Sequence, residues 1–122
     1  MTLVDTSVWI GHLRQPDPML ADLLAEGGVL GHAFVTGEIA CGTLRNRGTV
    51  LQALAELPQA AVAFHDEVLA FIDRHGLAGL GIGYVDAHLL AATRLTPGTR
   101  LWTLDRRLAT AASRLGLGGL TP

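Results

Sequence analysis

Met1-Thr2-Leu3-Val4-Asp5-Thr6-Ser7-Val8-Trp9 opens the chain with a mostly apolar run, an aspartate and two hydroxyl residues. The run Met1–Val4 predicts a short buried strand. Thr6 and Ser7 predict the start of a helix, because serine and threonine commonly cap helix N-termini. The aspartate between the two elements has two interpretations: it caps the helix, or it is a ligand at the end of the strand.

Apolar runs and amphipathic segments alternate along the rest of the chain. This alternation predicts an α/β domain, in which helices cover both faces of a short parallel sheet of four to five strands, a three-layer α/β/α arrangement. The strands are expected at Met1–Val4, Val29–His32, Ala60–Phe64, Arg100–Leu104 and, as a short fifth, Leu117–Leu120. The helices are expected from Thr6 and at Met19–Ala25, Val35–Arg45, Val50–Leu57, Asp66–Arg74, Tyr84–Leu95 and Arg106–Leu115. The 122 residues are enough for one domain with one core.

Four carboxylates lie in apolar surroundings that give an ordinary solvated charge little reason to be there. Asp5 and Asp105 each follow an apolar run, whereas Glu38 and Asp86 lie in segments with helical character. Ligands in open α/β sheets bind at the carboxyl ends of the strands, so we expect the four acids in one pocket. Carboxylates repel one another and resist burial, so the pocket needs a cation. Their oxygen donors suit Mg²⁺ or Mn²⁺.

Three of the acids also have a purely structural interpretation. Asp5 and Asp105 can cap the helices that follow them, and Glu38 can be a solvated helix position. Asp86 is harder to dismiss in this way, since it lies in the first turn of a mostly apolar helix, where the helix dipole favours an anion. The functional interpretation therefore depends on all four acids occurring together and in this order.

Composition and missing motifs argue against other classes of protein. All nine basic residues are arginine, whereas receiver domains and aspartate-based phosphatases typically hold phosphate with a lysine. The chain has no G-x-x-x-x-G-K-[ST] and no G-x-S-x-G, so we expect neither a P-loop nor a Ser-His-Asp hydrolase. A single cysteine fits a reducing cytoplasm. No apolar run reaches the roughly 18 residues of a membrane span, so we expect a cytoplasmic protein without one.

Four segments resemble the signature of PIN-domain nucleases, in particular the VapC toxins of bacterial toxin–antitoxin pairs. They are Leu3–Trp9, Val35–Ile39, Val85–Ala91 and Leu101–Leu108, and together they span nearly the whole chain in the family's order. The resemblance implies a single PIN domain over residues 1–122. It also implies an endoribonuclease toxin that hydrolyses RNA phosphodiester bonds with Mg²⁺ or Mn²⁺.

The resemblance assigns roles to residues at the matching positions. Asp5, Asp86 and Asp105 would hold the principal metal ion. Glu38 would complete the cluster with Asp86 around a second ion. The supporting residues of the site are Thr6, Ser7 and Thr103.

Three arginines are candidates for contacts with RNA phosphates. Arg45 lies seven positions after Glu38, on roughly the same stripe of the expected helix. Arg106 and Arg107 directly follow Asp105 and would flank the pocket. A solvated or ion-paired arginine is the alternative at each position.

The expected partners are RNA, a small VapB-like antitoxin and a second copy in a homodimer, with no membrane. The charged fraction of 16% is low, which suggests a covered apolar surface, and the segment from Trp9 to Leu24 is the expected antitoxin groove. Two alternatives stay open: a PIN nuclease of RNA processing without toxicity, and a catalytically inactive PIN-like module that binds RNA or protein. The complete set of four acids argues against the inactive module.

Overall fold

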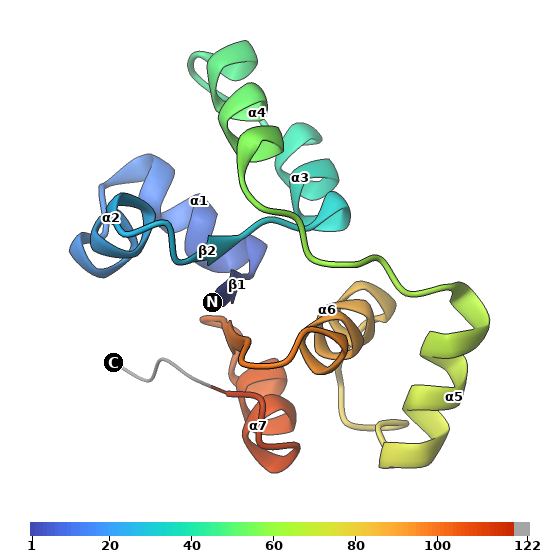
Figure 1. Cartoon of the computed structure of the whole chain (residues 1–122). Coiled ribbons are helices and arrows are strands. Elements are labelled where there is room, and N and C mark those ends of the chain that lie inside the picture. The colour runs from blue at the N-terminus through green and yellow to red at the C-terminus, as the bar shows by residue number, and fades with distance from the viewer. Residues whose placement is uncertain (119–122) are drawn as a thin grey trace.

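The computed structural model describes residues 1–118, and these residues form three strands and seven helices (Figure 1). The strands are β1 (Thr2–Val4), β2 (Val29–Leu30) and β3 (Arg100–Trp102). The helices are α1 (Thr6–Arg14), α2 (Pro18–Ala25), α3 (Ala33–Ala40), α4 (Arg47–Glu56), α5 (His65–His75), α6 (Tyr84–Leu95) and α7 (Arg106–Arg114). The predicted α/β class is confirmed.

β1 is the central strand of a parallel sheet with the order β2-β1-β3. Leu3 pairs with Leu30 on one side and with Leu101 on the other, and Val4 pairs with Trp102. Every residue of β1 is buried, as expected for the middle strand of a parallel sheet that is covered by helices. Because β1 and β3 are parallel neighbours, the residues after Val4 and Trp102 emerge at the same end of the sheet, the carboxyl ends of its strands.

The sheet of the described residues has three strands, whereas the sequence predicts four to five. The predicted strand Ala60–Phe64 does not form, and only a single bridge joins Gln59 to Gly31 beside β2. The physical reason is the length of β2. The chain turns into α3 at His32, its N-cap residue, so the segment after Ala60 finds no further ladder to pair with.

The other sheet edge is similar. The predicted fifth strand, Leu117–Leu120, contributes one bridge between Gly118 and Leu101, and the Leu101 N–H donates to the Leu117 carbonyl at 2.8 Å. Its last two residues lie outside the described residues. Both edges of the three-stranded sheet are thus extended by single bridges instead of strands.

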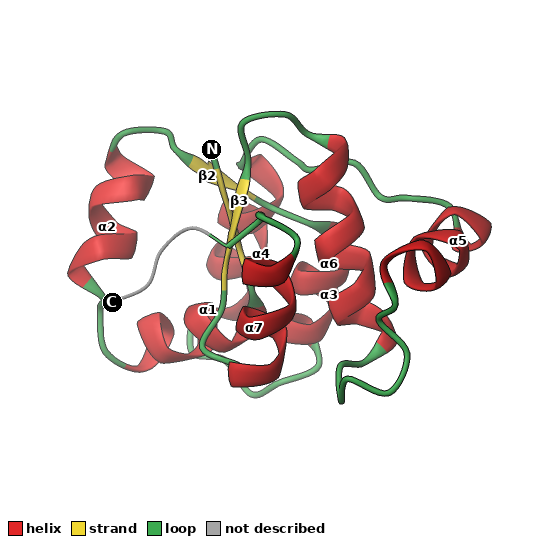
Figure 2. Cartoon of the chain, turned by 90° about the horizontal axis from the view of Figure 1, so that it is seen from below, coloured by secondary structure: helices red, strands yellow, loops and turns green. Residues whose placement is uncertain are grey.

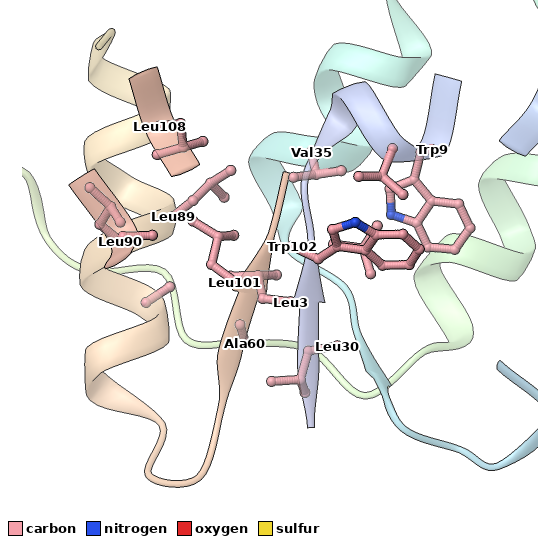
Figure 3. Packing of buried hydrophobic residues seen from close by; sticks show 14 of the residues in the cluster. Leu3, Trp9, Leu30, Val35, Ala60, Leu89, Leu90, Leu101, Trp102 and Leu108 are labelled. Carbon is pink, nitrogen blue, oxygen red and sulfur yellow. The ribbon is translucent and has the colours of Figure 1, made fainter. Parts of the chain in front are cut away.

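The core lies around β1 and β3 (Figure 3). Leu3 and Leu101 of the sheet share one buried cluster with Leu89 and Leu90 of α6, and each of these four side chains is at most 2% exposed. Burial of a large apolar side chain stabilises a fold by roughly 1.5–3 kcal/mol. The contacts of α6 therefore anchor the helix that carries Asp86 to the sheet.

Helices surround the sheet, which lies between α2 on one side and α3 and α6 on the other (Figure 2). α5 is the outermost element beyond α6 and packs against it. Within residues 1–118, no helix has both the length and the apolar character that crossing a bilayer requires.

Candidate active site

Asp5 is the first residue after β1, and the residue is almost fully buried, at 6% exposure. Asp5 Oδ2 accepts hydrogen bonds from Ser7 Oγ and Thr103 Oγ1, both at 2.7 Å, and a longer one from the Ser7 N–H at 3.4 Å. Thr103 directly follows β3, so the pairing of β1 with β3 creates this contact. Both hydroxyl groups hold Asp5 in one orientation.

Asp105 lies at the same end of the sheet, between β3 and α7. Its N–H donates to Thr103 Oγ1 at 3.0 Å, and its Oδ1 accepts from the Leu108 N–H at 3.0 Å as the N-cap of α7. Asp5 is likewise the N-cap of α1. The capping interpretation is therefore correct for both aspartates. Capping is compatible with a second role, because Asp5 and Asp105 follow the carboxyl ends of two neighbouring strands.

Glu38 of α3 lies at this same end of the sheet, next to the start of α1. Its Oε1 accepts a 2.6 Å hydrogen bond from Thr6 Oγ1, which joins α3 to the first residue of α1. Glu38 is exposed, and a Cβ atom added at neighbouring Gly37 would meet nothing within 4 Å. The glutamate thus stands beside open space, as its small-residue surroundings in the sequence predict.

Asp86 lies in the first turn of α6, and its Oδ2 accepts from the Gly83 N–H at 3.0 Å. Burial raises the pKa of Asp86, the Gly83 hydrogen bond opposes this change, and the negative charges of Asp5, Asp105 and Glu38 raise the pKa further. All three other acids therefore act on Asp86 through space. The fold therefore brings the four predicted carboxylates close enough for the charges of the other three to affect Asp86.

The donor set of this site fits a hard divalent cation, although the side chains do not form a finished cage. Within residues 1–118, no three aspartate, glutamate, histidine or cysteine side chains are grouped so that they could hold a metal ion as they stand. Mg²⁺ commonly keeps several waters and binds only one or two carboxylates directly. Among residues 1–118, the hydrogen bonds that the four acids accept come from hydroxyl and backbone N–H groups, and none comes from an arginine.

The predicted arginines occupy different places. Arg106 and Arg107 begin α7 directly after Asp105, and the Arg107 side chain lies across Gly81 in the loop before α6. Arg45 was expected on the helix of Glu38, and this is wrong: α3 ends at Ala40, and Arg45 lies in the turn before α4. Arg45 lines a surface cavity with Arg14 of α1. Arg45 therefore does not share a helical face with Glu38.

Sequence reasoning missed the rings beside the site. Phe34 of α3 packs edge-to-face on His88 of α6, with 4.5 Å between ring centroids, and His88 packs on Tyr84 at 4.6 Å. The spacing of Tyr84 and His88, four residues apart on one helix, was the available signal. The partner ring on α3 has no signal in the local sequence, because it depends on how two helices pack.

Comparison with known proteins identifies the family. No family model matches the chain. The chain is 47% identical over 117 residues to "Ribonuclease VapC32" of Mycobacterium tuberculosis, in strain CDC 1551 / Oshkosh and in strain ATCC 25618 / H37Rv. The alignment covers 96% of this chain and 94% of the relative. At this identity over nearly the full length of both proteins, the chain belongs to the VapC family of ribonucleases.

Proposed function

We propose that this protein is a metal-dependent endoribonuclease, the toxin of a toxin–antitoxin pair, which hydrolyses RNA phosphodiester bonds and is neutralised by a small VapB-like antitoxin. The observation that carries the proposal is the hydrogen-bond network at the ends of β1 and β3, where Thr103 joins Asp5 to Asp105. Asp86 lies close enough for the charges of the other acids, besides its own burial, to raise its pKa. Carboxylates gathered without a balancing cation are what a nuclease site for Mg²⁺ or Mn²⁺ requires. The ribonuclease name of the 47% identical relative supports the same activity.

The residues of the site have distinct roles in this proposal. Asp5, Asp86 and Asp105 hold the principal ion, and Glu38 completes the set around a second ion. When bound, such an ion activates water and offsets the charge that develops on the phosphate. Ser7 and Thr103 orient the Asp5 carboxylate through their 2.7 Å hydrogen bonds, and Thr6 orients Glu38 at 2.6 Å. These hydroxyls reduce the freedom of the acids before an ion arrives.

An apolar groove supports the antitoxin part of the proposal. It lies between α1, α2 and α4 and is lined by Trp9, His12, Leu13, Leu24, Val50, Ala53, Leu54 and Leu57. We infer that an amphipathic segment of the antitoxin docks here, with apolar side chains in the groove. The exposed Leu13 and Met19, at 38% and 40%, would be covered in the same complex. An arginine from the antitoxin would neutralise the acids by bridging their carboxylates.

We further infer a homodimer in the cytoplasm. The low charged fraction of 16% supports an additional covered apolar surface, of which part of the α1–α2 region is a candidate. Sedimentation of the purified toxin and of its complex with the antitoxin gives the number of copies directly. A monomeric toxin in both samples would contradict the homodimer.

The decisive experiment measures RNA cleavage by the purified chain after EDTA treatment and after addition of Mg²⁺ or Mn²⁺. Asp86→Asn and Asp5→Asn keep the side-chain shape and remove one charge, so we expect each to abolish cleavage. Asp73→Asn is the matched control, because Asp73 is an exposed acid near the end of α5. Cleavage by Asp86→Asn at the native rate, or native cleavage that persists in EDTA, would refute the mechanism.

A further inference from the structure

Five rings form a continuous column from the core of the protein to its surface. His32 lies edge-to-face against Phe34 with 5.4 Å between centroids, and Phe34 lies against His88 at 4.5 Å. His88 contacts Tyr84 at 4.6 Å, and Tyr84 lies 5.6 Å from His65. The column joins α3 to α6, the two helices that carry Glu38 and Asp86.

The inner part of this column is buried. His32 and His88 are 0% and 2% exposed, and neither ring nitrogen of His88 has a hydrogen-bond partner among the described residues. His88 therefore contributes as a packed neutral ring, because a buried unpaired charge would be costly. Edge-to-face pairs of this kind stabilise a fixed ring orientation.

The outer part of the column is open to solvent. Tyr84 is 44% exposed, although its ring is held by His88 on one side and its hydroxyl shares a 2.7 Å hydrogen bond with His65 Nδ1. The ring is thus held in place before any ligand arrives, so little conformational freedom remains to be lost when a ligand contacts it.

Tyr84 shares the first turn of α6 with Asp86. It is the first residue of α6, and Asp86 follows two residues later. The Asp86 carboxylate folds back to within 3.0 Å of the Gly83 N–H, which immediately precedes Tyr84. A phosphate at the four acids would therefore lie near the N-terminal end of α6. Because side chains two residues apart leave a helix on different sides, Tyr84 would meet a neighbouring nucleotide and not the phosphate itself.

We propose that Tyr84 is a stacking platform for one base of a single-stranded RNA substrate, next to the phosphodiester at the acid site. This inference rests on the proposed ribonuclease function. Unpaired bases are commonly bound by stacking on aromatic side chains, and removal of one such ring typically weakens binding measurably. The buried ring column gives the platform its rigidity. The hydroxyl–imidazole contact holds its outer edge.

The first test measures affinity with cleavage switched off. A fluorescently labelled short RNA that spans a site cut by the native chain is titrated in EDTA with native protein, Tyr84→Phe, Tyr84→Leu and Tyr84→Ala. We expect about tenfold weaker binding for the alanine and leucine variants, since one base stack of about 1.4 kcal/mol is lost, and near-native binding for the phenylalanine variant. Leu95→Ala, at the exposed far end of the same helix, is the matched control with native affinity.

The second test locates the stacked base. Each nucleotide of the RNA is replaced in turn by an abasic one. At one position next to the cut, we expect the abasic change to weaken binding to the native chain and to leave binding to Tyr84→Leu unchanged. Equal sensitivity of both proteins at every position would overturn the platform.

Other outcomes separate this inference from the proposed function. A native chain that cleaves RNA while Tyr84→Leu and Tyr84→Ala bind normally overturns the platform alone. A native chain that neither binds nor cleaves any RNA overturns both. Sedimentation of each variant completes the test: if the loss of affinity accompanies a change in the mass of the assembly, Tyr84 acts in self-association and the platform is overturned.

Discussion

Thr103 and Asp5 are 98 residues apart in the sequence, and Thr103 Oγ1 donates a 2.7 Å hydrogen bond to Asp5 Oδ2. The same hydroxyl accepts from the Asp105 N–H at 3.0 Å. One threonine therefore connects two of the carboxylates that we assign to the metal. This arrangement makes the orientation of both acids sensitive to a single oxygen atom.

Replacement of this oxygen is the first prediction. Thr103→Val keeps the side-chain shape but leaves the Asp5 carboxylate and the Asp105 N–H with one partner fewer. We expect a loss of stability of about 1 kcal/mol, since Thr103 is only half-buried, together with weaker Mn²⁺ binding. Thermal unfolding and metal titration measure the two effects. Thr103→Ser restores the hydroxyl and should restore both; a serine variant as weak as the valine variant would contradict this role.

The second prediction concerns the charge of Asp86. Its pKa is raised above the ordinary value of 3.8, so the folded state binds this proton more tightly than the unfolded state does. The charged form therefore costs stability once the pH rises through the folded-state pKa. We expect metal-free Asp86→Asn to melt at a higher temperature than native protein at pH 7, and the difference to disappear when the pH falls below the ordinary value. Equal melting temperatures at pH 7 would contradict the cost of burying this charge beside the other acids.

A bound metal ion should reverse this order of melting temperatures, so that the native chain melts above Asp86→Asn. Mn²⁺ is expected to raise the melting temperature of the native chain, because the ion binds the folded state and relieves the repulsion among the acids. The increase should be much smaller for Asp86→Asn and Asp5→Asn and unchanged for Asp73→Asn. Equal increases in all four proteins would mean that the ion binds elsewhere.

The third prediction is an acid-dependent loss of stability from His32. Burial, followed by the nearby His88, lowers the pKa of His32 from 6.5 to about 4. Below pH 6.5 the unfolded chain takes up this proton and the folded chain does not, so stability falls as the pH decreases towards 4. A shift of this size corresponds to about 3 kcal/mol. Denaturant unfolding between pH 7 and pH 5 measures the slope.

His32→Asn provides the comparison for this slope. Asparagine offers an oxygen that can replace His32 Nδ1 as the acceptor for the Phe34 N–H, and it does not titrate in this range. The variant will be less stable overall, because a buried ring is lost. Its stability should nevertheless depend less on pH between 7 and 5. A slope equal to that of the native chain would assign the acid sensitivity to other groups.

The fourth prediction uses two glycines of the loop before α6. Gly79 and Gly81 have similar left-handed backbone angles, with φ of +79° and +77°. An alanine at either position costs about 1 kcal/mol of backbone strain. Only at Gly81 would the added Cβ lie 2.7 Å from the Arg107 side chain, whereas at Gly79 it would meet nothing within 4 Å. Gly81→Ala should therefore displace Arg107.

The pair of variants isolates the contribution of Arg107. If Arg107 contacts an RNA phosphate, Gly81→Ala should bind RNA more weakly than Gly79→Ala and should lose part of the salt dependence of binding. Thermal unfolding of both variants checks that their strain is similar. Identical affinities would remove Arg107 from the list of phosphate contacts.

Several features were predictable from local sequence alone. The helix Tyr84–Leu95 has the predicted bounds, since its apolar pattern is long and regular. The strands at the start of the chain and before Asp105 were predictable as short buried runs. The number of strands was not, because pairing at the sheet edges depends on how far β2 extends before the chain turns at His32. The metal and catalytic roles of the four acids stay predictions.

The sequence by itself determined the α/β class, the order of the seven helices and the four carboxylates, because these follow from residue types and spacings along one segment at a time. Only the tertiary structure decided that Thr103 binds Asp5, that Arg45 lies outside the helix of Glu38, and that Phe34 and Tyr84 enclose His88. Each of these depends on where a helix ends or on contacts between segments distant in the chain. Such contacts are determined by packing and strand pairing, which no local pattern specifies.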